Sequence, residues 1–445
     1  PIRVLDEKGA TLLYHDISTN DIAYIEIGLD LRSLPRKCVQ YIPLFSRALL
    51  EMGTKKEDYV EISRRIDRKT GGLNPSVFIS SVKDKKAAEA RLFLCGKAML
   101  PQVGELFDII RDILLDVRLD NRERFRQMVL EEKARQEEQL VPGGHQAVNL
   151  RLRAHFSEAG RLAEQLNGVS YLFFLRELAD RIDTQWPSIH AMLEEVRHTL
   201  VNRESMLFNV TVDETGWEKV RSCLADFAGK MPAGAGGKVA GEFASDMNIP
   251  EYEGIIVPSQ INYVGKGADL YRSGYTYHGS ARVITRYLRT SWLWDRIRVR
   301  GGAYGAFCNF DKFSGVLTFL SYRDPNLLDT LKAFDETAGF LRKCELSSDE
   351  LTKGIIGAIG DMDGYMFPDA RGYISMIRYL TGNTEEDIQQ TRDEIFTTTA
   401  EDFKAFADAI DEVAKNGLVK VLGSENAMEE ATAGGQLNLK RLKIL

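Results

Sequence analysis

The sequence contains few cysteines, and none of them stands in a pattern that would organise a fold. Its five cysteines are scattered over 445 residues, are odd in number, and include no Cys-x-x-Cys pair. This spacing favours neither a disulfide framework nor a thiolate zinc site, and it indicates a reducing compartment. No apolar run approaches the roughly 20 residues of a membrane-spanning helix, so we expect no membrane partner.

An excess of positive charge is missing as well. The 58 Lys and Arg residues are outnumbered by 65 Asp and Glu residues, which gives a net charge of −7. This balance provides no electrostatic reason to bind nucleic acid or an anionic membrane, and an acidic surface would suit a cationic substrate. With 28% charged and 44% apolar residues, the chain has an ordinary globular composition and enough length for two or three domains.

Motifs for nucleotide binding and for nucleophilic catalysis are also missing. The run Gly234-Ala235-Gly236-Gly237 follows a predicted helix rather than a strand, and no Lys-Ser or Lys-Thr ends it. It is therefore interpreted as a linker rather than a phosphate-binding loop. No serine or cysteine can be paired with a histidine from the sequence, so no nucleophile is predicted.

The sequence does contain a repeat: the same order of predicted strands and helices occurs twice along the chain. In each series, strands are followed by a helical stretch that ends at a glycine pair, then by two more strands and another helix. The pairs Gly71-Gly72 and Gly301-Gly302 fall at the same place in the two series. The predicted ranges are 11–14, 22–29, 39–52, 58–70, 76–82, 90–95, 102–117, 206–212 and 217–227 in the first series, with further helices up to 198, and 255–258, 261–265, 281–298, 304–310 and 316–322 in the second.

We interpret this repeat as an ancient duplication that produced an α+β protein. Each copy is predicted to be a homologous domain with a mostly antiparallel sheet, helices packed on one face, and a helical excursion. The glycine-, alanine- and proline-rich stretch after the first copy marks the boundary. The predicted division is a first domain over 1–235, a linker over 236–250, and a second domain over 251–445.

The segment from Trp294 to Phe307 carries the most unusual polar groups. Apolar residues recur at helical spacing before Gly301 and Gly302 end the helix, and a strand is predicted to follow. Arg298 should lie in the last helical turn and Tyr304 at the start of the strand, close together if the chain doubles back. Such residues also occur as helix-dipole and packing groups, so composition alone leaves that alternative open.

The run Arg298 to Gly305, which reads Arg-x-x-Gly-Gly-Ala-Tyr-Gly, resembles the substrate-binding arginine and tyrosine of the presequence protease group of pitrilysin (insulinase-like) zinc peptidases. The arginine stands six residues before the tyrosine in that pattern, which selects Arg298 over Arg296 and Arg300. The run from Pro258 to Lys266 is also similar to this group. The resemblance implies two pairs of α+β domains that close like a clamshell on a peptide, of which this chain would be the C-terminal pair.

These peptidases bind zinc through an H-x-x-E-H motif on a helix, with a further glutamate downstream. None of the six histidines here fits that motif. His190, Glu194 and His198 share a helical face, but the two histidines lie about 12 Å apart along the axis, so one ion cannot bridge them. We therefore predict no metal ligand and no catalytic residue for zinc chemistry in this chain.

The resemblance implies a zinc-free C-terminal half of an oligopeptide-degrading zinc metalloendopeptidase. Its N-terminal catalytic half, in the same polypeptide or a separate chain, would bind the zinc, and the substrate would be an unstructured oligopeptide. Arg298, Tyr304, Gly301 and Gly302 are the predicted substrate-binding and transition-state residues. The alternative is a non-catalytic scaffold or peptide-binding subunit of the same fold. The expected location is cytoplasmic in a bacterium, or an organelle lumen such as the mitochondrial matrix in a eukaryote.

Overall fold

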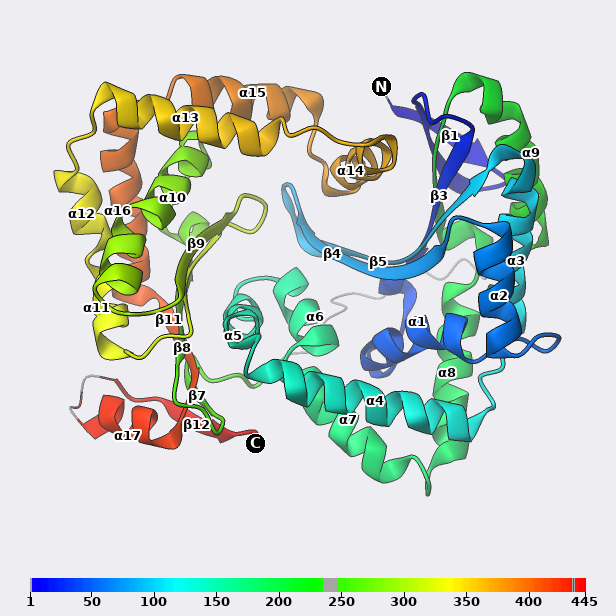
Figure 1. Cartoon of the computed structure of the whole chain (residues 1–445), viewed down its shortest axis with the longest axis horizontal. Helices are drawn as coiled ribbons and strands as arrows, with labels where there is room; N and C mark the ends of the chain where they lie inside the picture. Colours follow the sequence, from blue (N-terminus) through cyan, green and yellow to red (C-terminus); the bar gives the residue numbers. More distant parts are fainter. Residues whose placement is uncertain (1, 235–246, 434, 436) are drawn as a thin grey trace.

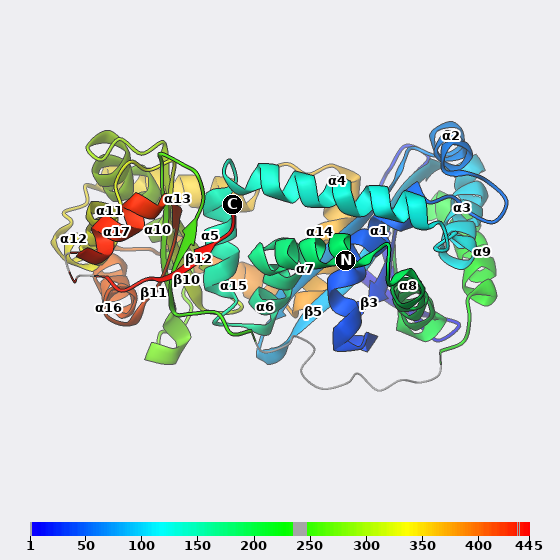
Figure 2. The ribbon, with the colours of Figure 1, turned by 90° about the horizontal axis from the view of Figure 1, so that it is seen from below.

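The structure is a computed structural model that describes residues 2–234, 247–433, 435 and 437–445. Most of the predicted linker over 236–250 lies outside the described residues. The molecule is elongated, with two six-stranded sheets and a helical layer between them. Further helices lie outside each sheet, at the two ends (Figures 1 and 2). Among the residues that the structure describes, no helix combines the length and apolar character needed to cross a bilayer.

The first sheet has the strand order β1-β2-β6-β3-β5-β4. Its neighbouring strands are antiparallel except for β2 and β6, which run parallel. The strands are β1 (Ile2–Glu7), β2 (Ala10–Asp16), β3 (Ile22–Asp30), β4 (Leu73–Val82), β5 (Lys85–Met99) and β6 (Met206–Val212).

The second sheet has the order β12-β7-β11-β8-β10-β9, in which β7 runs parallel to both β11 and β12 and the other pairs are antiparallel. The predicted α+β class is confirmed. Gly71-Gly72 precedes edge strand β4, and Gly301-Gly302 precedes edge strand β9, so the glycine pairs occupy equivalent places. The strands are β7 (Tyr252–Ile256), β8 (Tyr263–Asp269), β9 (Gly305–Asp311), β10 (Val316–Tyr322), β11 (Leu418–Gly423) and β12 (Lys440–Lys443).

The helices follow from apolar periodicity. In α3, for example, Leu106, Ile109, Ile110 and Ile113 lie on one face and are all fully buried. The helices of the first half are α1 (Ile42–Glu51), α2 (Tyr59–Lys69), α3 (Val103–Asp116), α4 (Arg122–Leu140), α5 (Gly144–Arg153), α6 (Glu158–Asn167), α7 (Val169–Arg181), α8 (Trp186–Leu200) and α9 (Glu214–Lys230). Those of the second half are α10 (Ser280–Thr290), α11 (Leu328–Asp335), α12 (Thr337–Lys343), α13 (Ser348–Met362), α14 (Pro368–Thr381), α15 (Glu385–Phe396), α16 (Ala400–Asn416) and α17 (Glu425–Ala433).

In each half of this chain, one helix packs on the sheet of the other half. Helix α5 packs on β8, β10 and β11 of the second sheet, and α14 packs on β4 and β6 of the first sheet (Figure 1). Val148 and Leu152 of α5 share a buried cluster with Tyr263 of the second sheet. Met376 of α14 does the same with Leu13 of the first sheet. This exchange fixes the two halves against each other.

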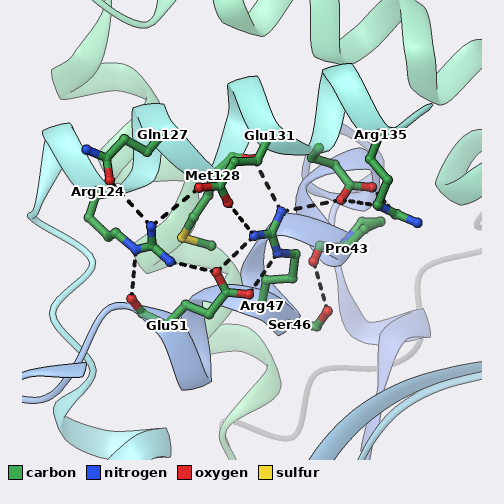
Figure 3. Close-up of polar contacts among 10 residues, drawn as sticks. Pro43, Ser46, Arg47, Glu51, Arg124, Gln127, Met128, Glu131 and Arg135 are labelled. Carbon is green, nitrogen blue, oxygen red and sulfur yellow. Dashed lines mark hydrogen bonds and ion pairs between the residues drawn. The ribbon is translucent and has the colours of Figure 1, made fainter. Parts of the chain in front are cut away.

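An arginine-centred network joins α1 to the helical layer (Figure 3). Arg47 on α1 donates to both carboxylate oxygens of Glu51 at 2.9 Å and to Glu131 on α4 at 2.9 Å. Arg124, at the start of α4, donates to the same Glu51 carboxylate at 2.9 Å and to the Glu51 carbonyl at 3.1 Å. Because Arg47 and Arg124 both bind Glu51, the network constrains the orientation of α1 relative to α4 more than a single surface pair would.

The exchanged helix α14 approaches the first sheet so closely that a glycine is required at the contact. A Cβ atom added at Gly372 would lie 1.7 Å from the Thr211 hydroxyl oxygen on β6. We expect Gly372→Ala to push α14 from the sheet and to reduce the free energy of unfolding by about 1–3 kcal/mol, as overpacked cores do. Urea unfolding measures this change.

The matched control is Gly360→Ala on α13, where an added Cβ would meet no atom within 4 Å. Alanine is the better helix former by about 1 kcal/mol, so this variant should be as stable as the parent or more so. Equal stability of the Gly372→Ala and Gly360→Ala variants would show that the α14 contact is loose.

Candidate substrate-binding site

The local backbone around Arg298 departs from the single helix predicted over 281–298. Helix α10 ends at Thr290, and a π-helical turn, η6 (Trp294–Val299), follows. Ser291 leaves the helical region at φ −121° and ψ −87°, and its hydroxyl donates to the Tyr287 carbonyl at 2.6 Å. This side-chain bond competes with the helix at that point. The prediction of one continuous helix was therefore wrong.

The glycine pair turns the chain from η6 into β9. Gly302 has φ +78°, in the left-handed region that favours glycine. A Cβ at Gly301 would lie 2.5 Å from the Ile297 carbonyl oxygen, so this position also requires glycine. The Asn326 side chain donates to the Gly301 carbonyl at 2.5 Å. The turn is thus built from both predicted glycines and held by a residue from the loop between β10 and α11.

This turn brings Arg298 and Tyr304 together. The Arg298 guanidinium carbon lies 4.0 Å from the centroid of the Trp294 ring and 5.6 Å from that of the Tyr304 ring. Both distances are within the range of cation–π attraction. Tyr304 is 66% exposed and Trp294 is 45% exposed, so the group lies at the surface.

The three neighbouring arginines differ in their partners. Arg296 donates to Glu336 at 2.8 Å, and Arg300 pairs with Asp295 at 2.9 Å. Within the described part of the chain, Arg298 makes no ion pair and its side chain makes no hydrogen bond. Its five N–H donors are therefore available to a ligand, and the stacking on Trp294 orients the guanidinium plane. The structure thus distinguishes Arg298 from Arg296 and Arg300.

Tyr304 is oriented by its backbone and by a second tyrosine. Its amide donates to the Tyr322 carbonyl at 3.0 Å, and the two rings meet edge to face at 5.6 Å. Tyr322 also contacts His145 of α5, with ring centroids 4.8 Å apart. The Tyr304 hydroxyl has no hydrogen-bond partner among the described residues. Helix α5, from the first half of this chain, thus supports the Tyr322 ring, which in turn contacts Tyr304.

Sequence reasoning missed two members of this group, Trp294 and Tyr322. The first had a usable signal, because Trp294 stands four residues before Arg298, a spacing that brings side chains together on a helical turn. The second had none, because Tyr322 reaches Tyr304 only through the pairing of β9 with β10.

No metal centre is found in the described ranges, where no group of three or more His, Cys, Asp or Glu side chains could hold an ion. The Glu194 carboxylate lies 3.6 Å from His190 and 3.7 Å from His198, and it also pairs with Arg197 at 2.5 Å. An arginine on the same carboxylate makes this helix face a poor cation site. The residues present therefore do not fit a zinc ion.

Two α+β units whose sheets are each also covered by a helix of the other unit define the class by fold, and this is the fold of M16 peptidase domains. The fold matches a solved M16 inactive domain from Pseudomonas fluorescens, with a TM-score of 0.66 and 14% identity over 95% of this chain and 98% of that one. A conserved protein from Enterococcus faecalis matches with a TM-score of 0.69 and 15% identity over 95% and 99%.

The sequence comparisons identify the family. Residues 252–425 match the model described as the PreP C-terminal domain, and residues 2–178 match the model for the domain associated with M16 peptidases of subfamily C. Presequence protease 1, chloroplastic/mitochondrial, from Arabidopsis thaliana is 41% identical over 97% of this chain and 40% of that protein. The chain therefore belongs to the presequence protease-like M16 peptidases, as a C-terminal half. It spans less than half the length of that relative.

Proposed function

We propose that the chain is the zinc-free C-terminal half of an oligopeptide-degrading zinc metalloendopeptidase, where it closes the chamber and supplies substrate-binding and transition-state contacts. The observation that supports this proposal most strongly is the set of contacts made by the Arg298 side chain. Its guanidinium is stacked on Trp294 and lies beside the exposed Tyr304, yet it has no carboxylate partner in the described residues. Its two neighbouring arginines differ in this respect, because Arg296 pairs with Glu336 and Arg300 pairs with Asp295.

Each predicted residue has a role that its chemistry permits. The Arg298 guanidinium donates to a substrate carbonyl, and the Tyr304 hydroxyl donates to the oxyanion that develops there during hydrolysis. Gly301 and Gly302 let the peptide backbone approach the turn. Zinc, which the M16 family implies for the whole enzyme, would be held by the N-terminal half and would activate the attacking water.

The proposal includes the division of the chain and its partners. The first domain would comprise residues 1–235, the linker 236–250, and the second domain 251–445. The N-terminal catalytic half and an unstructured oligopeptide are the proposed partners. A reducing compartment suits the five free cysteines. The chloroplastic/mitochondrial location in the name of the Arabidopsis relative supports an organelle lumen if the source is eukaryotic.

Reconstitution tests this function. The chain and a separately produced N-terminal half are each assayed on an unstructured peptide and then assayed as a mixture, with zinc content measured for all three. We expect hydrolysis only in the mixture, and far less than one zinc per molecule in this chain. An N-terminal half that is fully active alone would favour the alternative of a scaffold or peptide-binding subunit.

A further inference from the structure

A second group of unpaired cations lies farther along edge strand β9. Arg282 and Arg289 of α10 and Lys312, just after β9, line one cavity of about 410 Å³. Neither arginine makes a side-chain hydrogen bond or an ion pair with any described residue. Lys312 donates to the Asn383 side chain at 2.7 Å and has no carboxylate partner in the same ranges. The protein carries a net charge of −7, so three unpaired cations in one cavity are unexpected.

The two carboxylates in the wall of this cavity are already engaged. Asp311 pairs with Arg153 at 2.8 Å and also accepts from the Ser314 hydroxyl. Asp361 pairs with Arg286 from the same helix, α10. Asp311 and Asp361 are thus each paired with another arginine. Asp387, outside this wall, attracts Lys312 but forms no ion pair with it, so we expect the cavity to favour an anion.

The positions of the cations on α10 explain why they act together. Arg282 and Arg289 are seven residues apart, which is close to two helical turns, so both lie on the same side of the helix. The buried Thr285 lies between them on that side and also lines the cavity. Burial lowers the pKa of the Lys312 ammonium, and the nearby Arg282 lowers it further. An incoming anion would relieve this repulsion.

The wall opposite α10 is an unpaired strand edge. Strand β9 is last in its sheet and, among the described residues, pairs with β10 alone, and Figure 1 shows it beside α10. An edge strand offers backbone N–H and C=O groups to an added extended chain. Seven residues of β9 span about 23 Å at roughly 3.3 Å per residue. Tyr304 lies immediately before the strand and Lys312 immediately after it.

We propose that an extended peptide carrying carboxylate side chains docks along β9, with its carboxylates held by Arg282, Arg289 and Lys312. This inference rests on the proposed function for its ligand, because the same peptide would reach Arg298 and Tyr304 at the start of the strand. The cavity then acts as a specificity subsite for acidic residues several positions from the bond that is cut.

The test measures binding to the 445-residue chain by fluorescence anisotropy, without hydrolysis. Two labelled 15-residue peptides are compared. The first contains four Glu residues, and the second has Gln at the same four positions and is otherwise identical. We expect the Glu peptide to bind about tenfold more tightly at low salt, as two or three partly exposed charge pairs allow. The doubly substituted Arg282→Ala/Arg289→Ala chain should lose this preference and keep its melting temperature.

Lys404→Ala is the matched control, because it removes one exposed cation from α16, outside the cavity. It should keep the tenfold preference. Equal binding of the two peptides, or a preference retained by the doubly substituted chain, would overturn the subsite. Equal competition by free glutamate at matched carboxylate concentration would show a site for free anions and would overturn the peptide assignment.

A third peptide tests the strand edge. N-methyl groups on alternate residues of the Glu peptide remove the donors needed for pairing with β9, so this peptide should bind more weakly than the unmodified Glu peptide. Undiminished binding would overturn docking along the strand. These outcomes are separate from the proposed function, because a failure of the Arg298 and Tyr304 variants to alter hydrolysis would leave the binding results unchanged.

Discussion

In the complete enzyme, Arg298→Ala and Tyr304→Phe are each expected to lower kcat by about 10²- to 10³-fold, which is the usual cost of one lost transition-state donor. The reason lies in the geometry: the guanidinium is held 4.0 Å from the Trp294 centroid and 5.6 Å from the Tyr304 centroid, without a competing carboxylate among the described residues. Both side chains are at the surface, so neither change empties the core. Steady-state kinetics on an unstructured peptide measure the effect.

Arg300→Ala is the control for these variants. Arg300 lies two residues from Arg298 but pairs with Asp295, and it is 65% exposed. Its loss should change kcat less than about threefold and stability by less than about 1 kcal/mol. Equal activity in all three variants, or losses of activity that follow losses in thermal stability, would assign Arg298 and Tyr304 to packing.

The largest expected loss of stability is that of Arg151→Ala. Arg151 on α5 binds both carboxylate oxygens of Glu253 on β7 at 2.8 Å, and it also donates to Glu164 at 3.1 Å. The side chains of all three residues are at most 8% exposed. Burial raises the pKa of the Glu164 carboxyl, and Arg151 opposes that shift. Removing Arg151 leaves the buried Glu164 without a cation and Glu253 with only Lys420, at 3.9 Å, so we expect the free energy of unfolding to fall by about 3–5 kcal/mol.

Arg153→Ala provides the comparison for Arg151→Ala. Arg153 is two residues farther along the chain and also contacts the second sheet, through Asp311 at 2.8 Å, but 34% of its side chain is exposed. Its loss should cost about 1 kcal/mol or less. Urea unfolding measures the loss in free energy of unfolding for both variants. A loss below about 1 kcal/mol for Arg151→Ala would show that Lys420 or water compensates for the missing guanidinium.

Much of the fold could be predicted because its signals are local. Apolar periodicity predicted α3 and its buried face, and the glycine pairs marked the turns into the two edge strands. The exchange of α5 and α14 could not be predicted. Amphipathic periodicity indicates which face of a helix is buried, but it does not indicate which sheet covers that face. Gly144 and Gly372 show the difficulty: each is required by close contact with a sheet of the other half, at Tyr263 and Thr211.

The candidate site was predictable in part for the same reason. Arg298 and Tyr304 belong to one short run, so their spacing and the resemblance identified them together. Tyr322 and His145 reach the site through strand pairing and through α5, and no local pattern carries that information. The break after α10 coincides with a hydrogen bond from the Ser291 hydroxyl to the Tyr287 carbonyl, and periodicity does not detect such a bond.

The most direct measurement of the central claim compares a substrate peptide with a tetrahedral phosphinic analogue of the same peptide, bound to the complete enzyme. If Tyr304 acts on the transition state, Tyr304→Phe should weaken the analogue by about the same factor by which it lowers kcat, and should change substrate affinity little. Affinity for the analogue that is unchanged, or that falls only as much as substrate affinity, would contradict a transition-state role for this half.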